Sequence, residues 1–133
     1  MKHFTMTELT RSLTAQLHHI DNTPPPQAVE NLTALVEKVL DPLREAWGSP
    51  IHVNSGYRCP ALNKLVGGKP RSQHLTGNAA DITAGNAARN ARLYRLLQRL
   101  QLPVDQAINE HDFKWIHLSC SPRNRRQYLA IRS

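Results

Sequence analysis

The chain has 133 residues, of which 40% are hydrophobic, so it can form one compact core and has no room for a second domain. No apolar segment approaches the roughly 20 residues that span a bilayer, and the opening MKHFTMTELT lacks the apolar middle of a secretory signal. We therefore expect no membrane insertion and a chain that is cytoplasmic at synthesis, unless other factors export it.

The first predicted helix begins at a capping motif. Thr5 and Glu8 have the three-residue spacing of a capping box, which opens a helix that reaches about Leu17. A proline run at residues 24–26 then interrupts the chain.

Apolar residues at helical spacing predict a long amphipathic helix after these prolines. Pro42 should kink or divide it, and Gly48 can end it. Its apolar face consists of Val29, Leu32, Leu35, Val36, Val39, Leu40 and Leu43.

Short elements follow in the middle of the chain. Ile51 and Val53 alternate like a strand, and a turn at residues 56–58 leads into a short helix at residues 61–66, which two glycines end. The apolar run that begins at Asp81 predicts another strand.

The last third of the chain predicts one more helix and three strands. Asn86 can cap the helix, and residues 104–108 and 115–119 predict two strands joined by a hairpin-like connection at 109–114. Residues 127–131 add an edge strand, so the predicted fold class is α+β, with a small antiparallel sheet and helices packed on one side. The buried stripe of the helix is predicted to be Leu93, Leu96, Leu97 and Leu100.

Three residues form a candidate metal site. His74 and Asp81 lie seven residues apart around a glycine in the stretch SQHLTGNAAD, and His117 follows in the strand-like segment WIHLS. Two neutral histidines and one carboxylate, with a fourth position left to water, are the ligand set of a catalytic zinc. For either histidine alone, a structural role in the core is the alternative, so the prediction depends on the set.

A composite motif surrounds these residues and consists of Ser55-Gly56-Tyr57-Arg58, Ser72-x-His74-x-x-Gly77-x-Ala79-x-Asp81 and Trp115-Ile116-His117. With this motif the chain resembles the M15 zinc peptidases, the D-Ala-D-Ala carboxypeptidase-like group, and in particular their small single-domain branch. The likeness runs from about residue 2 to residue 121 and leaves 122–133 as a basic C-terminal segment. It implies a hedgehog/D-Ala-D-Ala peptidase-like fold, a single zinc peptidase domain over residues 1–133, and Zn²⁺ held by His74, Asp81 and His117.

The resemblance also implies a proton carrier, and the sequence departs from the family at that point. Members commonly have an acid three residues before the last histidine, where this chain has Lys114. Other members have a glutamate before a longer turn, which makes Glu110 the candidate general base. The alternative for Glu110 is an exposed acid in a turn.

The same resemblance assigns roles to residues around the metal. Arg58 lies in a segment that the family uses to contact the substrate or to stabilise the oxyanion, so it is a candidate for both roles, with a surface salt bridge as its alternative. Ser72, and Gln73 beside it, are candidates for substrate binding. His111 could donate a hydrogen bond to the tetrahedral intermediate or be solvated, and Trp115 is expected to pack in the core.

The formal net charge of +7 favours an anionic partner, and both nucleic acid and a bacterial wall polymer are suitable. Aromatic residues make up only 5% of the chain, which argues against stacking platforms for nucleic acid. We therefore expect a wall polymer and no nucleic acid, with a solvated helix face and a frayed tail as the alternative. The basic residues concentrate in Arg89, Arg92, Arg95, Arg99, Arg123, Arg125, Arg126 and Arg132.

Two cysteines, Cys59 and Cys120, do not make a disulfide framework and are expected to be small buried residues. A zinc set that includes their thiolates is a rival to the histidine and aspartate set. The sequence has no CxxC spacing that would support it.

The function implied by the resemblance is cleavage of peptidoglycan stem peptides by metal-activated water, as a D-Ala-D-Ala carboxypeptidase or an endopeptidase. A non-catalytic, zinc-stabilised domain that binds wall fragments or a protein partner is the alternative from another class, and Lys114 supports it. A metal-dependent amidohydrolase with a different small substrate is a third. We expect a monomer that acts at the bacterial cell wall after release, as a phage lysis enzyme (endolysin) or a prophage remnant would.

Overall fold

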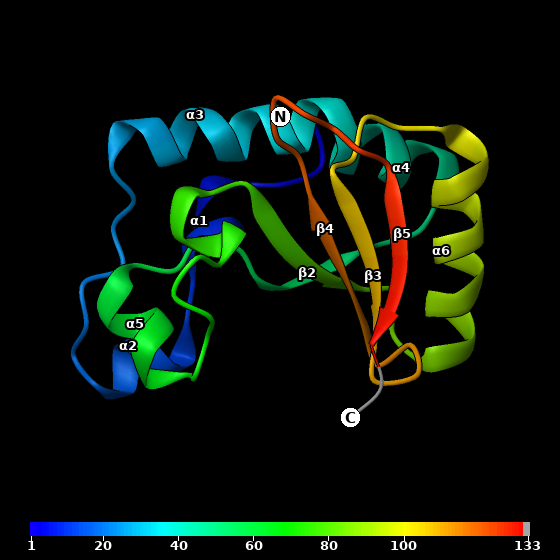
Figure 1. The fold of residues 1–133 in the computed structure, drawn as a ribbon. Helices are drawn as coiled ribbons and strands as arrows, with labels where there is room; N and C mark the ends of the chain where they lie inside the picture. The colour runs from blue at the N-terminus through cyan, green and yellow to red at the C-terminus, as the bar shows by residue number, and fades with distance from the viewer. Residues whose placement is uncertain (132–133) are drawn as a thin grey trace.

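The computed structural model of the protein describes residues 1–131, so Arg132 of the basic tail lies outside the described residues. The fold is α+β, as predicted, with a five-stranded sheet, and Figure 1 shows how the helices and strands are arranged. None of the helices among residues 1–131 is long and apolar enough to cross a membrane. The helical elements are α1 (Met6–Thr10), α2 (Leu13–Leu17), α3 (Pro26–Leu35), the π-helical turn η1 (Val36–Leu40), α4 (Asp41–Trp47), α5 (Pro60–Leu65), the 3-10 turn η2 (Gln73–Thr76) and α6 (Ala87–Leu100).

The sheet has the strand order β1-β2-β4-β3-β5. Its strands are β1 (His52–Ser55), β2 (Ala79–Thr83), β3 (Gln106–Glu110), β4 (Trp115–Ser119) and β5 (Gln127–Ile131). All pairs are antiparallel except β3–β5, so the predicted antiparallel sheet contains one parallel pair. Because β3 and β4 are antiparallel, β4 ends at the same end of the sheet at which β3 begins. A short loop then carries the chain to the far side of β3, and β5 runs in the same direction as β3.

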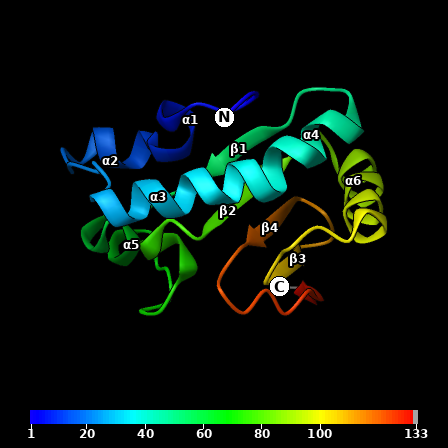
Figure 2. The same ribbon diagram turned by 90° about the horizontal axis from the view of Figure 1, so that it is seen from above.

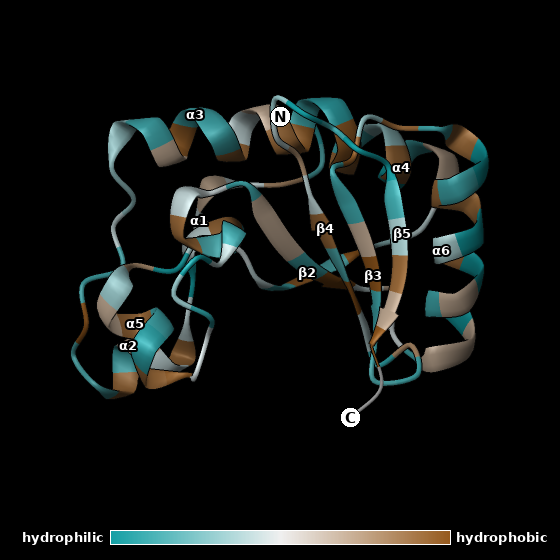
Figure 3. Cartoon of the chain, viewed as in Figure 1, coloured by the Kyte–Doolittle hydropathy of each residue, from teal (hydrophilic) through white to brown (hydrophobic). Residues whose placement is uncertain are grey.

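One face of the sheet is covered and the other is open. Ala80, Ile82, Ile116 and Leu118, at alternate positions of β2 and β4, are fully buried and belong to the core. Figures 1 and 2 show α3 and α4 running in line past the strands, with α6 beside them. Figure 3 shows the mixed hydropathy of these helices, and their buried apolar residues, among them Leu32, Leu43 and Leu93, belong to the same core.

The first predicted helix is wrong in its extent, because the segment forms two helices. The Thr5 hydroxyl accepts the backbone N–H of Glu8, as a capping box requires. However, Arg11 is extended, and the Ser12 hydroxyl accepts the backbone N–H of Ala15, which starts a new helix. A second N-cap inside the segment therefore divides it.

Pro42 divides the long helix, as predicted. Because a proline has no N–H to donate, the α-helical ladder cannot pass through it, and the turn before it is π-helical, with the Asp41 N–H donating to the carbonyl oxygen of Val36. Gly48 ends α4 with a left-handed φ of 78°.

The helix α6 is capped by Asn86, as predicted, with its side chain accepting from the Arg89 N–H. Leu93 and Leu97 are fully buried, but Leu100 is 37% exposed, so the predicted stripe is wrong there. Leu100 is the last residue of α6.

The strand predicted at 104–108 both begins and ends two residues later, as β3. The connection to β4 therefore covers only residues 111–114. His111, Asp112 and Phe113 all have left-handed φ angles, of 50°, 56° and 63°. The Asn109 side chain accepts the N–H of Phe113, and the buried Asn90 side chain donates to the Phe113 carbonyl. These side-chain contacts hold a turn that has no glycine, and for this reason the sequence pattern placed its boundary wrongly.

Candidate metal centre

Asp81 and His117 face each other across β2 and β4 in the sheet register. Their chain neighbours Ile82 and Ile116 are buried on the covered face, so the two polar side chains project from the open face. Asp81 Oδ1 lies 3.0 Å from His117 Nδ1. Strand alternation therefore delivers two of the predicted ligands side by side.

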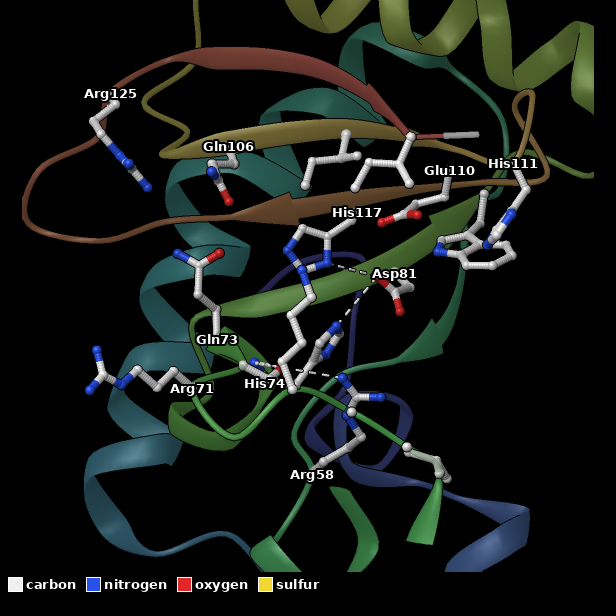
Figure 4. A pocket seen from close by; sticks show the side chains of 18 of the residues that line it. Arg58, Arg71, Gln73, His74, Asp81, Gln106, Glu110, His111, His117 and Arg125 are labelled. Atoms are coloured by element: carbon white, nitrogen blue, oxygen red, sulfur yellow. Dashed lines mark hydrogen bonds and ion pairs between the residues drawn. The ribbon is translucent and has the colours of Figure 1, made fainter. Parts of the chain in front are cut away.

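His74 reaches the same point from η2, the short turn that precedes β2. The Ser72 hydroxyl caps this turn by accepting the backbone N–H of His74, and Gly77 ends it in a left-handed conformation. The His74 side chain is 3% exposed, and its Nε2 lies 3.4 Å from Asp81 Oδ1 (Figure 4). Two strands and one turn thus bring the three predicted ligands together.

The tautomer of His74 follows from its other nitrogen. Nδ1 lies 2.6 Å from the carbonyl oxygen of Gly56, which can only accept, so Nδ1 carries the proton. In the neutral ring, Nε2 then directs a lone pair toward the Asp81 carboxylate. Two acceptors facing each other at this distance require a proton or a cation between them.

The donor set fits a zinc ion. His74, Asp81 and His117 each offer one ligand atom, and these atoms lie within 4.8 Å of one another. Ligands about 2.0–2.1 Å from a tetrahedral zinc are about 3.3 Å apart, close to the 3.0 and 3.4 Å that separate Asp81 Oδ1 from the two ring nitrogens. Two imidazoles and a carboxylate are also the ligand types of catalytic zinc sites.

The charge at the site is set by Asp81. Burial alone would raise the pKa of its carboxyl group, but the hydrogen bonds and charges of His117 and His74 outweigh burial and hold this pKa below its ordinary value. Asp81 is therefore an anion near neutral pH. This anion and two imidazoles together form a binding site suited to a divalent cation.

Arg58 borders the site through two hydrogen bonds. Its backbone N–H donates to the His74 carbonyl, and Nη2 donates to the Ser72 hydroxyl over 3.2 Å. Burial lowers the pKa of its guanidinium group, while the charge of Asp81 opposes that effect. No carboxylate among residues 1–131 forms a salt bridge with Arg58, so the surface salt-bridge alternative is wrong.

Glu110 lies on the open face with the three candidate ligands. It pairs with Trp115 across β3 and β4, one step along the same face from the pair of Ile108 with His117. Its side chain is half-buried and lines the pocket that contains His117. Lys114 is exposed in the turn and does not line this pocket. The acid and not the lysine thus faces the candidate metal site.

The pocket around the site has a volume of about 800 Å³ and is open to solvent. Trp115 and His111 both line it, with their ring centres 4.9 Å apart. The expectation that Trp115 packs in the core is therefore wrong. Its position on β4 alternates with the buried Ile116, which places it on the open face.

A buried acid beside this pocket was not predicted from the sequence. Asp105 is fully buried and accepts from Arg125 Nε at 2.8 Å, from Arg125 Nη2 at 3.0 Å and from Gln73 Nε2 at 3.1 Å. The Arg125 hydrogen bonds, opposed by burial, lower the pKa of Asp105 to about 2. An acid that follows a buried valine was the only local signal, and Arg125 was grouped with a frayed tail.

The cysteines lie outside the cluster of candidate ligands. Cys59 and Cys120 are buried and free, as predicted. The Cys59 sulfur caps α5 by accepting the Leu62 N–H. Among the described residues, the group that could hold a metal contains no thiolate, so the rival zinc set is wrong.

The chain is similar in sequence to known peptidases. A sequence profile of the family described as Peptidase M15 matches residues 2–119. A 48-residue stretch is 46% identical to a protein of Streptomyces albus G named zinc D-Ala-D-Ala carboxypeptidase. That stretch is 35% of this chain and only 19% of the Streptomyces protein.

Proposed function

The chain belongs to the peptidase M15 family, and on this premise we propose that it is a zinc-dependent peptidase that hydrolyses stem peptides of bacterial peptidoglycan. The cleavage is of the D-Ala-D-Ala carboxypeptidase or the endopeptidase type. The observation that carries the proposal is the meeting of His74, Asp81 and His117 at one point of a solvent-open pocket. The Streptomyces relative, a zinc D-Ala-D-Ala carboxypeptidase by name, supports both the metal and the substrate class.

The three ligands would hold the ion through His74 Nε2, Asp81 Oδ1 and His117 Nδ1. When bound there, zinc supplies an acidified water near neutral pH and polarises the scissile carbonyl. The Gly56 carbonyl keeps the His74 ring in the tautomer whose Nε2 can bind the metal. Three protein ligands leave a fourth position open for water or substrate.

Glu110 is the proposed proton carrier. Its carboxylate lines the same pocket as His117 and can take the proton of the attacking water and pass it to the leaving amine. The Arg58 guanidinium, which remains cationic near neutral pH, is the proposed partner of the oxyanion or of a substrate carboxylate. The Ser72 hydroxyl, which accepts a hydrogen bond from Arg58, is the proposed second contact to the substrate.

We propose that the enzyme acts at the bacterial cell wall and that it is a monomer. A basic chain would be attracted to anionic wall polymers. A phage lysis enzyme released through a membrane lesion, or a prophage remnant, is the context that we propose.

The test is incubation of the purified protein with peptidoglycan, with zinc and with a chelator, followed by mass analysis of the released peptides. The His117→Ala variant should lose both bound zinc and peptide release. The control variant His52→Ala, at an exposed position of β1, should keep both. Binding to peptidoglycan with no zinc-dependent product would contradict the proposal and favour a non-catalytic zinc-stabilised binding domain.

A further inference from the structure

The pocket extends to both sides of the candidate metal centre. Figure 4 shows Glu110 and His111 on one side of His117 and Asp81, and Arg71, Gln73, Gln106 and Arg125 on the other. We call this second group, together with Lys69 near Arg71 and Arg123 near Arg125 in the chain, the cationic end of the pocket. Among residues 1–131, the acids that line the pocket are Asp81 and Glu110, and neither belongs to the cationic end.

Most of the charge at the cationic end is uncompensated. Arg125 is paired with the buried Asp105. In contrast, Lys69, Arg71 and Arg123 form no salt bridge with any acid of residues 1–131, and their side chains are exposed. The attraction between one exposed cation and one distant charge contributes little free energy. Several cations converging on the wall of a pocket form a field that attracts an anionic group into it.

One wall of the pocket is formed by residues 122–131, which include Arg123 and Arg125, and hydrogen bonds hold it in place. The Arg125 side chain and backbone N–H both donate to Asp105, and the Gln127 N–H donates to the Asp105 carbonyl. Farther along, the Tyr94 hydroxyl lies 3.0 Å from the carbonyl oxygens of both Ala107 and Leu129 and shares its one proton between them, which joins α6 to β3 and β5. The frayed-tail alternative is therefore wrong for residues 122–131.

This wall lies beyond the part of the chain that matches the family. The family match ends at residue 119, whereas Arg123, Arg125 and Ile131 all line the pocket. Gln73, next to the candidate ligand His74, is tied to the wall through Asp105. A segment outside the family match thus completes one side of the pocket and is coupled to the turn that presents a candidate ligand.

We propose that the cationic end is an anion subsite of the substrate groove, which binds a free carboxylate of an acidic peptide at a distance from the bond that is cleaved. The inference rests on the proposed function for the identity of the groove. Arg71 and Arg123 attract and hold the carboxylate, and the amides of Gln73 and Gln106 can donate to it. Arg125 positions this surface through Asp105.

The test uses two synthetic stem pentapeptides that differ by one charge. One has D-glutamate with a free α-carboxylate at its second position, and the other has that carboxylate amidated. Each is titrated by calorimetry into zinc-loaded protein that has Glu110→Gln, to limit turnover. The Arg71→Gln/Arg123→Gln pair is compared with the matched pair Arg95→Gln/Arg99→Gln, which removes the same charge from the exposed face of α6.

We expect the parent, which is the Glu110→Gln protein without further substitutions, to bind the acidic peptide about tenfold more tightly than the amidated one. The Arg71→Gln/Arg123→Gln pair should lose this preference, and the α6 pair should keep it. Equal affinities in the parent, or a preference that survives Arg71→Gln/Arg123→Gln, would overturn the subsite.

Cleavage of both peptides by protein with Glu110 intact separates this inference from the proposed function. An acidic-peptide preference in binding, without cleavage of either peptide, would support the subsite and refute the peptidase. Cleavage of both peptides with equal kcat/KM would support the peptidase and overturn the subsite.

Discussion

His74 donates from Nδ1 to the carbonyl oxygen of Gly56 over 2.6 Å, a contact between residues 18 positions apart in the chain. Gly56 has no space for a side chain, because a Cβ there would overlap the backbone of Leu9. The orientation of a candidate zinc ligand therefore depends on a glycine that packs against α1.

The first prediction is that Gly56→Ala weakens zinc binding about 10- to 100-fold, because displacement of the Gly56 carbonyl releases the His74 ring. It should also destabilise the fold by about 1–3 kcal/mol through overpacking. Zinc titration and urea denaturation measure the two effects. Gly48→Ala is the control, since its Cβ would meet nothing within 4 Å and the cost is confined to its φ of 78°. Unchanged zinc affinity in Gly56→Ala would show that the contact with Gly56 does not orient His74.

The second prediction concerns metal removal. Because the three ligands come from η2, β2 and β4 and meet only in the folded chain, zinc should stabilise the native state. At a free zinc concentration about 100 times Kd, the expected gain is about 2.7 kcal/mol. Thermal unfolding with zinc and with a chelator measures it. The gain should vanish in Asp81→Ala and persist in His52→Ala, and an equal gain in both variants would place the zinc elsewhere.

The third prediction is that Glu110→Gln lowers kcat by about 10²- to 10⁴-fold while zinc content stays the same, because an amide cannot accept the proton of the attacking water. Asp112→Asn, in the adjacent turn, is the matched control and should retain activity. Hydrolysis at the parent rate by Glu110→Gln would remove Glu110 from the mechanism.

The fourth prediction is an acid-dependent loss of stability at Asp105. Its pKa in the folded state is about 2, below the ordinary value, because Arg125 bonds the ionised form. Since the folded pKa is depressed, the ionised pair contributes its full stability above about pH 4 and loses it as the pH falls toward 2. The expected contribution is about 2 kcal/mol.

Denaturation of the parent and of Asp105→Asn between pH 7 and pH 2 checks this contribution. The variant should be less stable at pH 7 and should lose less stability over the acid range. Glu30→Gln, at an exposed acid of α3, should follow the parent curve. Parallel curves for the parent and Asp105→Asn would show that the Asp105–Arg125 pair does not contribute.

Much of the architecture could be predicted from local patterns. The N-caps at Thr5 and Asn86 and the ends of β4 are where the sequence placed them. The resemblance to the M15 peptidases, based on a motif from Ser55 to His117, is confirmed by the family match. Features that depend on local hydrogen bonds or on strand alternation are encoded within a few residues, so pattern analysis recovers them.

Features that depend on distant contacts were mispredicted. Trp115 was expected to pack in the core, yet its side chain lines the pocket. The β3–β4 turn was placed wrongly because Asn90 and Asn109 stabilise it in place of a glycine. Arg125 was grouped with a loose tail because its partner, Asp105, lies 20 residues earlier.

The sequence by itself determined the secondary elements and the candidate ligand types, because these follow from periodicities of two and 3.6 residues and from side-chain chemistry, while Glu110 was identified through the resemblance to the M15 peptidases. Only the tertiary structure decided that His74, Asp81 and His117 meet at one point and that Glu110 shares their face. It also decided that the C-terminal segment completes the pocket. Strand pairing and the burial of Asp105 set these relationships, and both involve residues too far apart in the chain for a local pattern to record.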